Sequence, residues 1–187
     1  CAIKNELINY SPQKVYNSKE FIIFVGNIKP HKGLDTLVKG WRYAKEKGLD
    51  KQLVVVGEKE GFKTKLSNEE FLKDKDIIFT GRISDEELYN YMNNASILVQ
   101  PSIYEGFGLP PLEALYLGTP CLLSDIEVFK EIYSDFQNCY FFEKENTKDL
   151  AEKLLLISSS KEIEQKKHIT SKYNFSITAK IILDNIL

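Results

Sequence analysis

Two glutamates with seven residues between them frame a segment rich in glycine and proline. The segment begins at Glu105, ends at Glu113 and reads EGFGLPPLE. Carboxylate oxygens accept hydrogen bonds, so each glutamate could bind the vicinal hydroxyl groups of a sugar. Two glycines allow a ligand to approach the backbone closely. Either glutamate alone is better explained as a solvated loop residue or a helix-end charge, but the pair in this segment favours a hydroxyl-binding site.

A second candidate site is the turn from Gly26 to Gly33, which reads GNIKPHKG and lies between an apolar segment and an amphipathic one. Where a strand leads into a helix, free backbone N–H groups and the positive helix end can bind an anion, and Lys32 adds a positive charge there. The spacing matches neither common phosphate-binding loop, G-x-x-x-x-G-K-[ST] or G-x-G-x-x-G. These residues alone leave phosphate binding and an ordinary strand–helix connection equally open.

Short apolar segments alternate with longer amphipathic segments, which is the pattern of βαβ units around a parallel sheet. The apolar segments are unbroken and mostly end at glycine, proline or serine, as expected for strands buried on both faces. We therefore expect an α/β fold with a doubly wound, mainly parallel, six-stranded Rossmann-like sheet. The expected strands cover residues 21–26, 53–57, 77–81, 97–100, 121–124 and 140–142.

The helices expected between these strands are marked by residues that suit helix ends. Ser84 and Glu87 match a capping box. Pro110 and Pro111 suit a first helical turn, and Asp125 is expected to cap a helix that ends at residue 133. The expected helices cover residues 33–47, 85–94, 110–118, 125–133, 146–158 and 161–187. Ligands of such sheets bind outside the carboxyl ends of the strands, which is where both candidate sites lie.

The segment from Glu105 to Leu115 resembles the E-x7-E signature of the family 4 retaining glycosyltransferases. The turn from Gly26 to Gly33 resembles that family's G-[RN]-x-x-x-x-K-G turn, in the P-H-K form of its mannosyltransferase-like members. Residues 81–88, GRISDEEL, resemble a third landmark of the family. The resemblance runs from residue 21 to residue 142 in order and with the family's spacing, and includes Ala95, Pro101-Ser102, Gly118-Thr119-Pro120 and Ser124-Asp125-Ile126.

The resemblance implies catalytic roles for Lys32 and Glu105. Lys32 would bind the donor diphosphate and stabilise charge on the leaving group, and Glu105 would hold hydroxyl groups of the transferred sugar. Glu113 would accept hydrogen bonds from both ribose hydroxyls. Arg82 and Ile83 would border the base.

The other donor-binding residues that the resemblance implies lie in the two motifs. They are Gly26 and Asn27 in the first, and Gly106, Phe107, Gly108 and Leu109 in the second, whose backbone amides would meet the phosphates and the sugar. Many members of the family carry a phosphate-binding arginine where this chain has Asn27. Lys32 is therefore expected to be the main cation of the turn at the diphosphate, and assistance from Lys29 or Arg82 stays open.

The resemblance also implies the two-domain GT-B architecture and a transfer with retention that needs no metal and no cofactor. The donor would be a nucleotide sugar, GDP- or UDP-hexose, and a glycan or lipid-linked acceptor would bind through an amino-terminal domain missing here. Residues 1–20 are expected to be an entry linker, and residues 21–187 the donor-binding domain with carboxy-terminal helices. The isolated chain should transfer poorly. A donor-binding subunit of a split transferase and a non-catalytic nucleotide-sugar-binding module stay open.

The bulk composition argues against several other classes of protein. A net charge of -2 over 187 residues gives no electrostatic reason to expect nucleic acid as a partner, and no apolar run approaches a membrane span. Three cysteines without metal-ligand or redox spacing fit a reducing compartment. We therefore expect a cytoplasmic protein, whose full-length form could lie at the inner face of the membrane. Because the chain starts with Cys1 rather than methionine, we expect a fragment of a longer protein.

Overall fold

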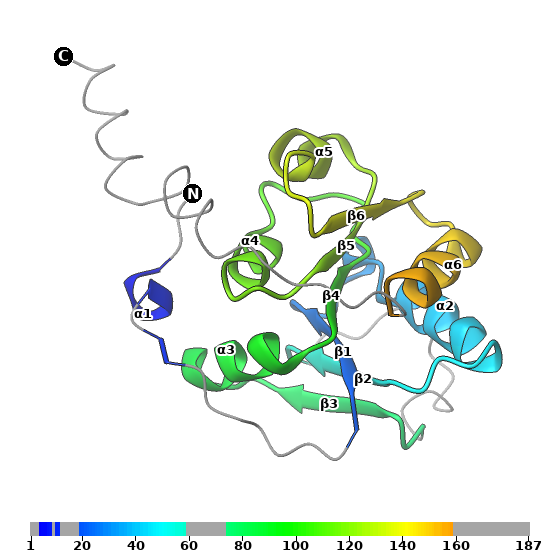
Figure 1. Ribbon diagram of the computed structural model, residues 1–187, viewed down its shortest axis with the longest axis horizontal. Coiled ribbons are helices and arrows are strands. Elements are labelled where there is room, and N and C mark those ends of the chain that lie inside the picture. Colours follow the sequence, from blue (N-terminus) through cyan, green and yellow to red (C-terminus); the bar gives the residue numbers. More distant parts are fainter. Residues whose placement is uncertain (1–3, 9, 12–18, 59–73, 159–187) are drawn as a thin grey trace.

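The computed structural model describes residues 4–8, 10–11, 19–58 and 74–158. Six strands form one sheet in the order β3-β2-β1-β4-β5-β6, and every neighbouring pair is parallel (Figure 1). The predicted doubly wound α/β fold is confirmed. The helix predicted for residues 161–187 lies outside the described residues. The strands are β1 (Phe21–Val25), β2 (Gln52–Val56), β3 (Ile77–Gly81), β4 (Ile97–Gln100), β5 (Cys121–Ser124) and β6 (Cys139–Phe142).

The strand order places the first strand of the sheet in its middle. From β1 the chain winds outward to β3 along one half of the sheet, then returns to the other side of β1 and continues outward to β6. The connections that leave β1 and β4 therefore lead away in opposite directions. In open α/β sheets this switch point, outside the carboxyl ends of the strands, is where ligands bind.

Helices cover both faces of the sheet (Figure 1). One face packs against α2 and α6, and the other against α1, α3, α4 and α5. The alternation of side chains along β1 shows why its sequence is apolar throughout, because Phe21, Ile23 and Val25 join one core while Ile22 and Phe24 join the other. The helices are α1 (Asn5–Ile8), η1 (Pro30–Lys32), α2 (Leu34–Glu46), α3 (Asp85–Asn94), α4 (Leu109–Tyr116), α5 (Glu127–Tyr133) and α6 (Thr147–Ser158).

Two of the helix starts are capped by side chains. The Ser84 hydroxyl accepts a hydrogen bond from the Glu87 amide, and the Glu87 carboxylate accepts one from the Ser84 amide, so the predicted capping box is confirmed. At the start of α6, Asn146 Oδ1 accepts from the amides of Lys148 and Asp149 at 3.1 and 3.0 Å. Asn146 is therefore the residue that caps α6.

The prediction that Asp125 caps the following helix is wrong. Ile126 occupies the N-cap position of α5, and no side chain caps that helix. The Asp125 carboxylate instead accepts a hydrogen bond from the Lys144 amide at 2.8 Å and contacts Lys130 Nζ at 3.1 Å. A backbone amide from the turn after β6 and a lysine ammonium thus bind the carboxylate that was expected to bind the first turn of α5.

Part of the predicted entry linker packs on the domain. Leu7 of α1 is buried in the same core as α3 and α4. Lys4 Nζ contacts the Asp85 carboxylate at 2.8 Å, and the Tyr10 ring meets the Tyr89 ring edge-on, with centroids 5.8 Å apart. The described residues of this segment therefore add to the core beside α3.

The turn after β1 lies unusually close to the chain that leaves β4. Gly33 has a φ of 67°, and a methyl group at its Cα would lie 2.0 Å from the Pro101 carbonyl oxygen. Only glycine can adopt this backbone conformation without strain and also leave room for the neighbouring backbone. The two loops can lie against each other only because residue 33 has no side chain.

Replacing Gly33 with alanine is expected to lower the free energy of unfolding by roughly 2–4 kcal/mol, since backbone strain and a steric clash add. Urea unfolding followed by the fluorescence of Trp41, the single tryptophan, measures the loss.

Gly48→Ala is the matched control for this change. Gly48 also has a positive φ, 102°, but a methyl group there would meet no atom of the described residues within 4 Å. Its expected loss is about 1 kcal/mol, from backbone strain alone. Equal losses in the two variants would contradict the close contact at Gly33.

Candidate functional site

The two predicted motifs meet at the carboxyl edge of the sheet. One follows β1 and the other follows β4, and these strands are neighbours although their motifs are far apart in the sequence. The Ile103 amide donates a hydrogen bond to the His31 carbonyl oxygen at 2.8 Å, which joins the two loops directly. Adjacent parallel strands therefore bring Lys32 and Glu105 to one place.

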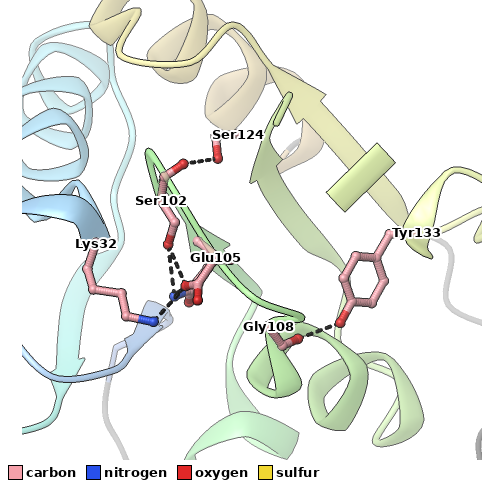
Figure 2. A network of polar contacts seen from close by, with 7 residues as sticks. Lys32, Ser102, Glu105, Gly108, Ser124 and Tyr133 are labelled. Carbon is pink, nitrogen blue, oxygen red and sulfur yellow. Dashed lines mark hydrogen bonds and ion pairs between the residues drawn. The ribbon is translucent and has the colours of Figure 1, made fainter. Parts of the chain in front are cut away.

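Lys32 and Glu105 form an ion pair at the centre of this edge. Lys32 Nζ donates to Glu105 Oε1 at 2.7 Å, and the two side chains are only 21% and 9% exposed. Ser102 Oγ donates to the same carboxylate oxygen at 2.8 Å, and Gln100 Nε2 approaches it at 3.4 Å. Figure 2 shows Lys32 and Ser102 both turned toward Glu105. Glu105 is thus held in one orientation by groups from both loops.

The sequence motifs assigned no role to Gln100 or Ser102 and did not predict the ion pair. Gln100 and Ser102 are both buried, and Ser102 is held in turn by a hydrogen bond from Ser124 Oγ to its carbonyl oxygen (Figure 2). The signal for Gln100 was present, because it is a polar residue at the end of the otherwise apolar strand β4. The pairing of Lys32 with Glu105 had no such signal, because sequence spacing does not tell which loops lie side by side.

Gly108 shapes the start of α4. It is the N-cap residue, with a φ of 81°, and a methyl group at its Cα would lie 2.5 Å from the Phe129 ring. Its carbonyl oxygen accepts a hydrogen bond from the Tyr133 hydroxyl, so the last residue of α5 holds this loop in place (Figure 2). No side chain caps this helix start. Gly106 and Phe107 belong to the loop that leads to Gly108, and Leu109 is the first residue of α4.

Glu113 lies on α4 in a different environment from Glu105. Its side chain is only 7% exposed, and it makes no side-chain hydrogen bond within the described part of the chain. Burial raises the pKa of Glu113 to about 7, and the nearby charges of Lys4 and Asp85 act in opposite directions, Lys4 lowering it and Asp85 raising it. Burial prevails, so this carboxyl group is poised to change its charge near neutral pH.

Four predicted residues line a hollow of about 370 Å³ over the carboxyl ends of β1, β2 and β3, which we name the β1–β3 hollow. They are Gly26, Asn27, Arg82 and Ile83. Arg82 is largely exposed, and one of its nitrogens lies 3.6 Å from the Glu58 carboxylate at the rim of the hollow. Glu113 is not part of this lining. The structure therefore groups the residues predicted to border the base, and it places the predicted ribose-binding glutamate outside their hollow.

Within residues 4–8, 10–11, 19–58 and 74–158, no three side chains of His, Cys, Asp or Glu are arranged to hold a metal ion. The helices in the same ranges are too short or too polar to cross a bilayer.

Comparison with known proteins agrees with the fold and the motifs. Residues 9–174 match the family model described as Glycosyl transferases group 1. The O-antigen chain mannosyltransferase RfbU of Salmonella typhimurium is 29% identical over 171 residues, which make up 90% of this chain and 45% of RfbU.

Two solved structures share the fold. Sucrose-phosphate synthase from Thermosynechococcus elongatus superposes with a TM-score of 0.78 at 19% identity, over 100% of this chain and 50% of that one. Anabaena Alr3699/HepE, solved in complex with UDP and glucose, superposes with a TM-score of 0.70 at 14% identity, over 90% and 48% of the two chains.

This chain spans half or less of each of these three proteins. At such low sequence identities, the two solved structures support the fold alone. The match to the family model is the stronger evidence, because it covers nearly the whole sequence, from residue 9 to residue 174. The chain belongs to the family Glycosyl transferases group 1.

Proposed function

We propose that this chain is the donor-binding half of a retaining glycosyltransferase, which transfers a hexose from GDP- or UDP-hexose to a glycan or lipid-linked acceptor. The observation that carries the proposal is the Lys32–Glu105 ion pair beside the β1–β3 hollow, at the switch point of the sheet. The cation can bind a diphosphate, the carboxylate can bind sugar hydroxyls, and the adjoining hollow can hold a nucleoside. Membership of the family, the name of RfbU and the UDP and glucose bound to HepE support it.

The donor would lie along the carboxyl edge of the sheet. Its nucleoside would occupy the β1–β3 hollow next to Arg82 and Ile83, its diphosphate would contact Lys32, and its hexose would contact Glu105. The lysine ammonium has three donor hydrogens, so Lys32 can keep its bond to Glu105 while it binds a phosphate oxygen. The backbone from Gly106 to Leu109 leads from Glu105 into the first turn of α4, where it can approach the donor.

Lys32 would supply most of the rate effect from this half of the site. As the nucleoside diphosphate leaves, the anomeric carbon becomes cationic and the diphosphate gains negative charge, which a preorganised cation stabilises. The neighbouring Asn27 carries no charge, so Lys32 bears this role in the turn. Glu105 would bind and orient the hexose hydroxyls rather than form a covalent intermediate.

The acceptor would bind to a separate amino-terminal domain that faces this edge, with residues 1–20 as the entry segment and residues 21–187 as the donor-binding domain. The chain spans 45% of RfbU, which supports a second half of similar size. The same fraction also suits a donor-binding subunit that needs a partner chain, which is our second candidate. Transfer by this chain mixed with a separate acceptor-binding chain would distinguish the two.

We place this activity in the cytoplasm, at the inner face of the membrane in the full-length protein. Cys121 and Cys139 both carry free thiols, which supports a reducing compartment. Burial raises the pKa of both thiols, to about 12 for Cys139, so they are unreactive small apolar side chains rather than catalytic groups. Fractionation of cells that express the full-length protein would test the location.

Nucleoside diphosphates are expected to bind the chain with modest affinity, and the binding should survive EDTA. The physical reason is that Lys32 and the start of α4 meet the phosphates without a metal. Calorimetric titration with GDP, UDP and ADP, each with magnesium and with EDTA, measures this. Binding of none of the three, or binding only with magnesium, would refute the proposed function.

Lys32→Ala is expected to weaken the binding of the diphosphate about ten- to a hundredfold, because a hydrogen bond to a charged group is lost, and to leave the bare nucleoside nearly unaffected. Glu105→Gln should change diphosphate binding less than about threefold and remove the extra affinity of the nucleotide sugar. Calorimetry on both variants and on the double variant measures the effects and their coupling.

Lys29→Ala is the matched control, because Lys29 is an exposed lysine of the same turn. It should bind the diphosphate like the parent protein. If Lys32→Ala also binds like the parent, the turn after β1 is only a connection between strand and helix.

Glu113 gives the binding a pH dependence. Ribose hydroxyls donate to the ionised carboxylate, so nucleotide affinity is expected to rise with pH through about 7. Glu113→Gln should weaken binding at pH 8 about tenfold and remove most of this pH dependence. Calorimetry between pH 5.5 and 8.5 measures both effects. The control ligand is the deoxyribose nucleotide, which lacks one of the two hydroxyls that would donate to Glu113.

The same shift predicts the stability of the unliganded chain. The folded pKa of Glu113 lies above its unfolded value, so the folded state binds the extra proton, and ionisation lowers stability as pH rises from about 4.5 to about 7. Glu113→Gln should therefore be more stable than the parent at pH 8, by about 1–3 kcal/mol, and similar at pH 4.5. Urea unfolding at both pH values tests this, and a loss of stability at pH 8 would mean that the carboxylate is partnered.

A further inference from the structure

A second hollow, of about 470 Å³, lies over the other half of the carboxyl edge. We name it the β4–β6 hollow, because the loops after β4, β5 and β6 form it. Its lining includes Glu105 from the loop after β4 and Lys144 from the turn after β6. Its main lining residues are Tyr104, Glu105, Ile126, Glu127, Val128 and Lys144.

The Lys32–Glu105 ion pair stands between the two hollows. Lys32 comes from the loop after β1, whose first residues, Gly26 and Asn27, line the β1–β3 hollow, and Glu105 belongs to the lining of the β4–β6 hollow. The pair therefore joins the loops of β1 and β4, the two central strands in the order β3-β2-β1-β4-β5-β6. A nucleotide sugar that fills the first hollow and ends at Glu105 has its hexose at the entrance of the second.

The walls of the β4–β6 hollow combine an aromatic ring, apolar groups and charges. Tyr104 is 70% exposed, which is high for so large an apolar side chain. Ile126 and Val128 are half-buried, and Glu127 and Lys144 are exposed. The C–H face of a pyranose can lie on an aromatic ring while its hydroxyls bond to a carboxylate and an ammonium. The lining carries three carboxylates, those of Glu105, Asp125 and Glu127, and one ammonium, so the hollow suits a neutral saccharide better than an anion.

Polar contacts hold these walls in place. Asp125 accepts from the Lys144 amide at 2.8 Å and contacts Lys130 at 3.1 Å, so the loops after β5 and β6 are joined. Ser124 Oγ bonds to the Ser102 carbonyl oxygen, which joins the loop after β5 to the loop after β4. The three loops are thus connected before any ligand arrives, which lowers the cost of ordering the site on binding.

We propose that the β4–β6 hollow is a saccharide subsite for the acceptor, in which the sugar residue that receives the transferred hexose stacks on Tyr104. The assignment to the acceptor rests on the proposed transferase function, whereas the saccharide site itself rests on the lining. In this arrangement the donor-binding half contributes part of the acceptor site.

The length of the hollow favours the acceptor over the donor hexose. From β4 to β6 the sheet spans two strand spacings, about 9–10 Å. The hollow therefore extends beyond the loop that carries Glu105, across the loops after β5 and β6. Glu105 Oε1 is also turned toward Lys32 and Ser102, at the end of the hollow nearest β1. The rest of the lining, including Tyr104 and Lys144, is left for a second saccharide.

Titration of the isotope-labelled 187-residue chain with methyl α-D-mannopyranoside and methyl α-D-glucopyranoside, followed by amide NMR shifts, tests the site. Shifts are expected at Tyr104, Val128 and Lys144. Tyr104→Ala should weaken the better glycoside about two- to tenfold, since an aromatic contact is lost. Tyr104→Phe keeps the ring and should keep the affinity, and both variants should bind nucleoside diphosphates like the parent.

Repeating the titration with saturating GDP-mannose or UDP-glucose separates acceptor from donor. The glycoside shifts should persist beside the nucleotide sugar. If the nucleotide sugar removes them and the nucleoside diphosphate does not, the hollow belongs to the donor hexose and the proposal is wrong. It is equally wrong if no glycoside shifts these amides, if Tyr104→Ala changes nothing, or if Tyr104→Phe loses the binding. Glycoside binding without any nucleotide binding would overturn the transferase function and the acceptor role, and would keep only the saccharide site.

Discussion

Lys32 and Glu105 are 73 positions apart in the sequence, yet their side chains meet at 2.7 Å because β1 and β4 are adjacent in the sheet. Much of the edge is built around this contact. Gly33 has no side chain so that the loops can approach, while Gln100 and Ser102 hold the carboxylate and Ser124 holds Ser102. The opposite charges stabilise each other in a partly shielded place and separate the two hollows. Removing either charge leaves the other with fewer partners, so the two motifs work as one unit.

Much of the fold could be predicted from the sequence, because strands buried on both faces read as unbroken apolar runs and helix ends carry local chemistry. The capping box at Ser84 is such a local signal. Asp125 shows where local reasoning fails, since the amide that binds its carboxylate belongs to Lys144, 19 positions away. Leu7 was missed for the same reason, because one apolar residue in a polar segment shows no periodicity that reveals its burial.

The candidate site was predictable in its residues but not in its arrangement. The motif identified both glutamates, yet their environments differ: Glu105 accepts bonds from Lys32 and Ser102, whereas Glu113 is buried and lacks a side-chain hydrogen bond within the described residues. Burial of a carboxyl group without a partner opposes ionisation, which raises its pKa. Such a group destabilises the empty fold and gains most from a ligand that donates to it, which is why stability and binding are coupled there.

The position of β1 in the middle of the sheet also has a consequence for how the chain is made. Ribosomes deliver β1, β2 and β3 first, and these strands can pair among themselves as soon as they emerge. The other edge of β1 pairs with β4, whose residues follow more than 70 positions later. Until then the apolar run FIIFV presents an open strand edge, the kind of surface on which nascent chains aggregate. Closing that edge and bringing Glu105 to Lys32 are therefore parts of one late step in folding.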